Sequence, residues 1–246
     1  MIPCTIKHLD NYTPVDNAAY IAALASKYWG DKGVSLGVAF MTQPTMSLAN
    51  RILLHMNAWG KHANVKFFMT GTDPKVRIAF EPNGGYWSYL GTDILSVPRN
   101  KPTMNLAGFS DSTPESEFLR VVRHETGHTL GFPHEHMRAE LVNRLDPAKT
   151  IAYFQRTQGW SADQTRAQVL TPLPESALLR AAPVESTSIM CYQLPGLITK
   201  DGQPIPGGTD ITRLDHAYAA TIYPKDSVVT KPKRLIIEGE FTAREE

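Results

Sequence analysis

Hydrophobic and polar residues alternate with two different periods in the first half of the chain. Residues 34–41 place apolar side chains at every second position, as a half-buried strand does. From Pro44 onward, apolar residues recur every three or four positions, which predicts a helix across Leu48, Ile52 and Met56. Further strands are expected at residues 65–70, 75–80, 86–90 and 103–109, with 86–90 as an edge strand.

A strong helix start signal follows at residues 111–117, which read Asp-Ser-Thr-Pro-Glu-Ser-Glu. Thr113 can cap the helix, Pro114 suits its first position, and the two glutamates lie at the positive end of the helix dipole. The helix is expected to run to Leu130. Gly131 then ends it, because glycine tolerates the left-handed backbone conformation of a C-cap.

The second half of the chain is less regular. Three more helices are expected, at residues 147–157, 162–170 and 211–222. Residues 171–209 contain six prolines and should be mostly irregular. Before the first strand we expect an irregular lead-in at residues 1–17 and a short helix at 18–28. The last residues, 225–246, are a charged tail that could form a strand at 234–241 or be a disordered end.

Composition and charge exclude several classes of partner. The chain has 246 residues, with 25 Lys and Arg against 24 Asp and Glu, so its net charge is +1. This balance gives no bulk attraction to nucleic acid or to an anionic membrane, and the apolar stretches are too short to span a bilayer. The two cysteines, Cys4 and Cys191, are expected to be separate thiols, with a single bridge between them as the alternative. We expect no export signal in the first 30 residues, which lack a basic stretch followed by an apolar one.

The chemistry of the chain centres on residues 124–134, which read His-Glu-Thr-Gly-His-Thr-Leu-Gly-Phe-Pro-His. His124 and His128 are four residues apart on one helix, so their rings project from the same face and can bind one zinc ion at ~2.0–2.1 Å. Gly131 lets the chain turn and brings back His134 as a third ligand. Three imidazoles leave the fourth position open, which is typical of catalytic zinc. The alternative is a histidine-rich, solvated helix end.

Glu125 lies beside this predicted zinc site. Zinc lowers the pKa of its bound water from ~15.7 to about 7, and a carboxylate at this position can accept the proton as general base. The same carboxyl group can then deliver the proton to a leaving amine. The residues therefore predict amide hydrolysis by a zinc-activated water.

Two motifs resemble the astacin family of metzincin metallopeptidases. The pattern at 124–134 is typical of metzincins. Ser188-Ile-Met-Cys-Tyr192 is similar to the astacin Met-turn, except that Cys191 stands where astacins usually have histidine. Residues 131–138 and 211–223 are also similar to astacin segments, so that the resemblance covers about residues 29–224. The usual astacin disulfides are missing, which indicates a reducing compartment or a simplified, bacterial-type relative.

The resemblance implies one catalytic Zn²⁺ held by three histidines: His124, His128 and His134. It also implies that Glu125 is the general base and that Met190 forms the apolar floor beneath the metal. Tyr192 would be a mobile fifth ligand whose hydroxyl stabilises the oxyanion. Glu135 would tie down the mature N-terminus, and an extended peptide substrate would add as a strand to the edge of the sheet.

The fold implied by the resemblance is α+β and zincin-like. It has an N-terminal twisted mixed sheet with a backing helix and an active-site helix, and a largely irregular C-terminal subdomain that ends in a helix. The expected divisions are a lead-in at 1–28, a catalytic domain at 29–224 and a tail at 225–246. Within the catalytic domain, the upper subdomain is about 29–131 and the lower about 132–224.

The predicted function is that of a zinc-dependent endopeptidase, a monomer that acts on protein or peptide substrates and binds neither nucleic acid nor membrane. Two alternatives stay open: a non-catalytic zinc- or peptide-binding module on the same scaffold, and a latent, self-processing peptidase with one target. Cys4 could inhibit such an enzyme as a zinc-bound thiolate. His136 is expected to contact the zinc ligands from behind or to lie at the surface. The chain is expected in the cytoplasm or to be exported without a leader, whereas the family implies secretion.

Overall fold

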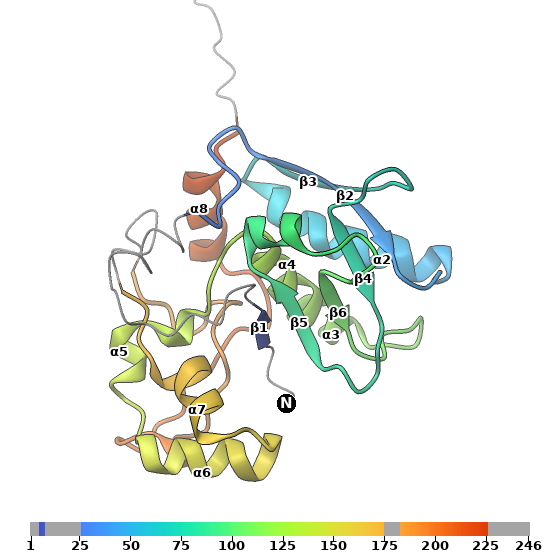
Figure 1. Cartoon of the computed structure of the whole chain (residues 1–246). Helices are drawn as coiled ribbons and strands as arrows, with labels where there is room; N and C mark the ends of the chain where they lie inside the picture. The colour runs from blue at the N-terminus through green and yellow to red at the C-terminus, as the bar shows by residue number, and fades with distance from the viewer. Residues whose placement is uncertain (1–4, 8–25, 175–182, 226–246) are drawn as a thin grey trace, which may run out of the picture.

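The computed structural model describes residues 5–7, 26–174 and 183–225, and in this part of the chain six strands form one mixed sheet. They are β1 (Thr5–Lys7), β2 (Val34–Phe40), β3 (Val65–Met69), β4 (Val76–Ala79), β5 (Tyr86–Tyr89) and β6 (Met104–Leu106). The strand order is β1-β5-β6-β4-β2-β3. Neighbouring strands are parallel except β5 and β6, which are antiparallel (Figure 1).

The helices lie against this sheet and below it (Figure 1). They are α2 (Met46–Met56), α3 (Glu115–Glu117), α4 (Arg123–Thr129), α5 (Ala139–Val142), α6 (Pro147–Gln158), α7 (Ala162–Thr165) and α8 (Arg213–Ile222). None of the helices in the described residues has the length and apolar character to span a bilayer. The sheet with its helices is the mixed α+β fold that the sequence predicted.

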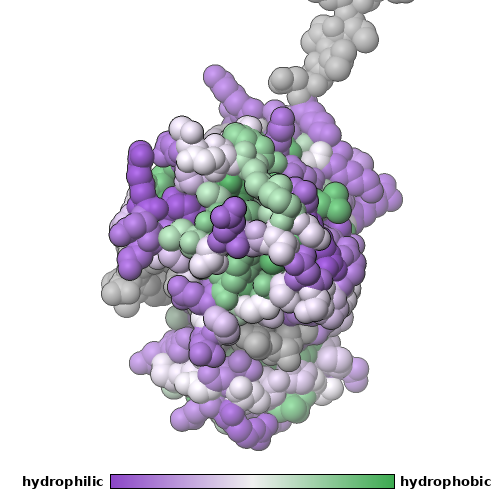
Figure 2. Space-filling model, turned by 90° about the vertical axis from the view of Figure 1, so that its right-hand side faces the viewer, coloured by the Kyte–Doolittle hydropathy of each residue, from purple (hydrophilic) through white to green (hydrophobic). Residues whose placement is uncertain are grey.

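Two apolar cores support the molecule. The first core lies between the sheet and the helices α2 and α4, with Ile52, Met56 and Trp59 almost completely buried. The second core is built around α6, and it includes Phe154 and Trp160. In Figure 2 the larger upper part of the molecule holds the sheet, the smaller lower part holds α6, and apolar residues gather on the upper part of the face shown.

The strands predicted from alternating residues are present in the structure, but the N-terminal lead-in is not irregular throughout. Thr5–Lys7 forms β1, which pairs in parallel with β5. β5 therefore lies between β1 and β6, and it is not the edge strand that was predicted. A strand of three residues forms through backbone pairing with its neighbour, and it is too short to be recognised from a side-chain pattern.

Two predicted elements at the ends of the chain lie mostly or wholly outside the described residues. Of the helix expected at 18–28, only residues 26–28 are described, and they form a turn rather than a helix. The strand considered at 234–241 falls entirely outside the described residues.

The helix expected from residue 113 to residue 130 is present, with two differences. Pro114 is its N-cap, because the hydroxyl of Thr113 instead accepts a hydrogen bond from Ser110 N at 2.9 Å. The helix also widens to a π-helix at Phe118–Val122, between α3 and α4. It ends at Gly131 as predicted, with a φ of 93°.

Candidate active site

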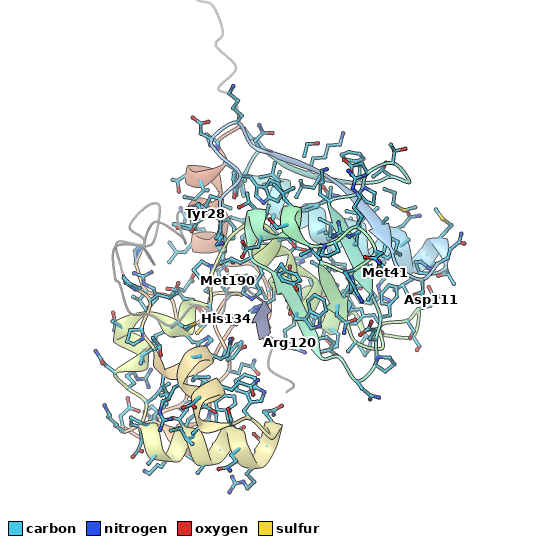
Figure 3. The ribbon with its side chains drawn as sticks, in the orientation of Figure 1. Tyr28, Met41, Asp111, Arg120, His134 and Met190 are labelled. Carbon is cyan, nitrogen blue, oxygen red and sulfur yellow. The ribbon has the colours of Figure 1, made fainter. Side chains whose placement is uncertain are left out.

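The three histidines predicted as zinc ligands meet at one point. His124 and His128 lie one turn apart on α4, and the reversal at Gly131 returns the chain so that His134 faces them. The Nε2 atom of His134 is 3.3 Å from Nε2 of His124 and 3.1 Å from Nε2 of His128. All three rings are buried, and Figure 3 shows His134 and Met190 where the sheet part of the molecule meets the lower helices.

The hydrogen bonds behind two of these rings prepare them for a metal ion. Nδ1 of His124 donates to the carbonyl oxygen of Ile189 at 2.6 Å, and Nδ1 of His128 donates to that of Phe132 at 2.8 Å. Because a carbonyl oxygen only accepts, Nδ1 carries the proton in both rings and Nε2 offers a lone pair. Nitrogen lone pairs that face one another at these distances repel, and a cation between them removes this repulsion. The site therefore fits one zinc ion.

Burial also keeps His124 in the form that a metal ligand needs. Removal from water lowers the pKa of His124 to about 4, although the Ile189 carbonyl raises it in part. The ring is therefore neutral at neutral pH, and a neutral imidazole is the metal-binding form.

The Met-turn, residues 188–192, contacts the histidines through Ile189 and Tyr192, and it is held by Asp215 at the start of α8. The Asp215 carboxylate accepts hydrogen bonds from the Ser188 hydroxyl at 2.6 Å and from Ile189 N at 2.9 Å. The Ser188 hydroxyl in turn accepts from Met190 N at 3.0 Å. Asp215 was not among the residues predicted for the site. The only signal was its position in the first turn of the helix expected at 211–222.

Met190 lies directly against α4 at Gly127. A Cβ atom added at Gly127 would lie 2.3 Å from Sδ of Met190 and 3.1 Å from the ring of Trp59. Such distances are far below normal contact, so the Met190 side chain can pack this closely against α4 because glycine has no Cβ atom.

Glu125 faces a cavity beside the three histidines. The residue is 1% exposed, and the cavity, including its opening to solvent, measures about 640 Å³. Tyr192 and His124 line the same cavity. Its wall also carries Arg120, which forms an ion pair with Glu117 at 2.7 Å. Because the cavity opens to solvent, a substrate group can reach the metal site from this side.

The ring of Tyr192 packs against two histidines. Its centroid is 4.4 Å from that of His134 and 4.0 Å from that of His136, and the Tyr192 and His136 rings are stacked at an interplanar angle of 17°. His136 is fully buried, so of the two positions predicted for it the surface one is wrong. Desolvation by burial lowers the pKa of His136 to about 3, although a hydrogen bond with the backbone of Gln168 raises it in part.

Glu135 connects two segments behind the site. Its Oε1 atom accepts a hydrogen bond from Glu185 N at 3.0 Å, and its backbone N donates to the Met190 carbonyl at 2.9 Å. It also pairs with Arg138 at 3.5 Å. The chain N-terminus, which the family resemblance connects with this residue, lies outside the described residues, as does Cys4.

Cys191 has a buried thiol that forms no disulfide among the described residues. Desolvation raises its pKa, so the group is a neutral thiol.

The fold and the histidine site together define a class of protein, the zinc metallopeptidases. Residues 23–150, which are 128 of the 246 residues, match the model of the peptidase family described as Astacin. The chain therefore belongs to the astacin family, and it is a zinc metalloendopeptidase of that family.

Solved structures support the same assignment. A structure of myroilysin is 29% identical, covers 82% of this chain and 98% of its own, and superposes with a TM-score of 0.76. A crystal structure of myroilysin is 27% identical, covers 91% of each chain, and has a TM-score of 0.65. High choriolytic enzyme 1, a hatching enzyme zinc-protease from the medaka fish Oryzias latipes, shares the fold at 18% identity and a TM-score of 0.54, over 81% of this chain and 95% of its own. No curated protein sequence matches the chain.

Proposed function

We propose that the protein cleaves internal peptide bonds with Glu125 as general base and acid and Tyr192 as the group that stabilises the oxyanion. The observation that carries this proposal is that His124, Glu125 and Tyr192, from two separate segments, line one cavity. Zinc, when bound by the three histidines, supplies a Lewis acid and lowers the pKa of a water molecule.

Glu125 and Tyr192 then divide the remaining chemistry. The Glu125 carboxylate takes a proton from the attacking water and passes it to the leaving nitrogen, because its position one residue after His124 puts it beside the metal. The Tyr192 hydroxyl donates a hydrogen bond to the oxygen of the former carbonyl as charge develops there. A low-dielectric cavity strengthens both interactions.

Met190 and Glu135 have supporting roles in this proposal. Met190 provides an apolar floor under the histidines and fixes the distance between the Met-turn and α4, in keeping with its contact with Gly127. Glu135 joins the segment at Glu185 to the Met-turn through the hydrogen bonds described above. The resemblance assigns Glu135 to the N-terminus instead, which lies outside the described residues.

The pairing of β1 with β5 favours one of the two alternatives, a latent enzyme. A substrate that adds as a strand needs the outer edge of β5, next to the cavity residue Tyr86. In the structure Thr5–Lys7 occupies this edge, with Thr5 opposite Trp87 and Lys7 opposite Tyr89. We therefore propose that β1 must leave before a peptide substrate can pair with β5.

The main experiment measures zinc content and cleavage of a mixed peptide library for the wild type, Glu125→Gln and Tyr192→Phe. His62→Gln is the matched control, since His62 is an exposed histidine away from the triad. We expect one zinc per chain in all four proteins, and a fall in kcat of about 10²–10⁴ in Glu125→Gln. Zinc in all four proteins without cleavage in any, even after β1 is displaced, would favour the non-catalytic binding module. A wild type without zinc would refute the proposal.

A backbone substitution tests the role of β1. Ile6→Pro removes an N–H group from the short strand, whereas Ile6→Val keeps its strand propensity. We expect kcat/KM to rise in Ile6→Pro and to stay constant in Ile6→Val. Equal values in both variants would show that β1 does not compete with substrate.

A further inference from the structure

The position of the Tyr192 ring depends on a neighbour that belongs to neither the zinc ligands nor the Met-turn. His136 stacks on Tyr192 with a centroid distance of 4.0 Å and an interplanar angle of 17°, which is nearly face to face. His134 touches the same tyrosine ring at 4.4 Å, tilted by 57°. The His124 ring is also stacked on Tyr192, at 6.5 Å and 28°, so His136 is nearer to Tyr192 and more nearly parallel to it. The stacked ring of His136 therefore restricts the plane of the Tyr192 ring.

His136 is itself held from the second apolar core. Its Nε2 atom lies 3.0 Å from the carbonyl oxygen of Gln168, and since the carbonyl only accepts, Nε2 carries the proton. Gln168 lies in the π-helix Arg166–Leu170, which ends two residues later, so its carbonyl belongs to the last turn, where the helix offers no partner. The adjacent Val169 is completely buried and fixes this turn in the core.

We propose that His136 is a positioning residue, which holds the Tyr192 ring so that its hydroxyl is aligned for the oxyanion. This inference rests on the oxyanion role proposed for Tyr192. A ring stacked on Tyr192 restricts rotation about its two side-chain bonds, so that fewer orientations of the hydroxyl compete with the one that stabilises developing charge. The path runs from Gln168 through His136 to Tyr192, and it links the second core to the cavity.

Two substitutions separate the parts of this contact. His136→Gln keeps an N–H donor close to the Nε2 position but has no ring face, whereas His136→Phe keeps a ring face but cannot bind the Gln168 carbonyl. Each is made in the wild type and in Tyr192→Phe, with His62→Gln as the control. Zinc content, kcat and KM are measured for every protein.

We expect kcat of His136→Gln to fall roughly threefold to tenfold, the range of one aromatic contact, with KM within about twofold of the wild type. His136→Phe should lose less. In the Tyr192→Phe background, His136→Gln should cause no further fall, because the hydroxyl that it positions is already gone.

The outcomes distinguish this inference from the proposed function beneath it. An unchanged kcat in Tyr192→Phe would overturn the role of Tyr192 and this inference with it. A normal loss in Tyr192→Phe, combined with a His136→Gln effect of equal size in both backgrounds, would overturn this inference alone. Loss of zinc in both His136 variants would assign His136 to the metal site and would also overturn it.

Discussion

Replacing Gly127 with alanine would place a methyl group between α4 and the Met-turn. The new Cβ atom would lie 2.3 Å from Sδ of Met190. Non-bonded atoms settle at about 3.5–4.0 Å, so the Met190 side chain would have to move by roughly 1.5 Å. Such overpacking costs about 1–3 kcal/mol, and the better helix propensity of alanine offsets about 1 kcal/mol. We expect a net destabilisation of about 0–2 kcal/mol.

A double-mutant cycle with Met190→Ala isolates this contact. Without the methionine side chain the 2.3 Å contact is gone, although the 3.1 Å approach to the Trp59 ring remains. Gly127→Ala should then be neutral or stabilise the protein by up to about 1 kcal/mol through helix propensity. The assay is urea unfolding at one fixed concentration of unbound zinc, because zinc binding contributes to the measured stability. Gly71→Ala is the control, since a Cβ atom there meets nothing within 4 Å. The same change in free energy in both backgrounds would refute the reasoning.

Three further predictions concern stability. Within the described part of the chain, the buried Arg77 guanidinium donates only to backbone carbonyls, those of Lys101, Pro74, Lys75, Val97 and Pro98. Arg77→Leu should therefore cost about 2–4 kcal/mol in urea unfolding, and a loss below about 1 kcal/mol would contradict this. For His136, the pKa is near 6.5 in the unfolded chain and about 3 in the folded one. The unfolded state thus binds more protons between these pH values, and stability must fall as pH drops from 6.5 towards 3. With zinc removed by a chelator, the thermal midpoint of His136→Phe should depend less on pH over this range than that of the wild type. An equal dependence of the midpoint on pH in both proteins would contradict this contribution of His136. Finally, removing zinc with a chelator should lower the free energy of unfolding by about 2.7 kcal/mol, compared with a sample in which unbound zinc is at about 100 times its Kd. Zinc but not magnesium should restore it, and an unchanged thermal midpoint on chelation would show that the histidines hold no metal.

The elements that the sequence predicted best are those whose signal is local. The triad lies within eleven residues of one helix and its turn, so spacing alone placed all three histidines, and Gly131 adopts the left-handed conformation expected of it. The strand β2 was recognisable because apolar residues occupy every second position along it. Thus the fold class and the metal centre could both be predicted from the sequence.

The contacts around the metal centre could not be predicted from local sequence patterns. His136 and Tyr192 are 56 positions apart, and Asp215 holds a Met-turn more than 20 residues before it. No periodicity encodes such pairs, because they depend on how segments far apart in the chain pack together. The same holds for β1, whose partner is the backbone edge of β5, and for the π-helix at Phe118–Val122, whose hydrogen bonds span one residue more than those of an α-helix.

The local spacing of the zinc ligands also has a consequence for the order of folding. His128 finds the acceptor for its Nδ1 proton four residues away, within the same turn, whereas the acceptor for His124 lies 65 residues further along the chain. Closing a loop of about ten residues costs little entropy, so the segment can take up zinc once α4 and its turn have formed. The Met-turn and Tyr192 reach the site only when the distant segment, residues 188–192, packs against the histidines. We therefore expect a newly made chain to acquire its metal before it acquires the ability to cleave.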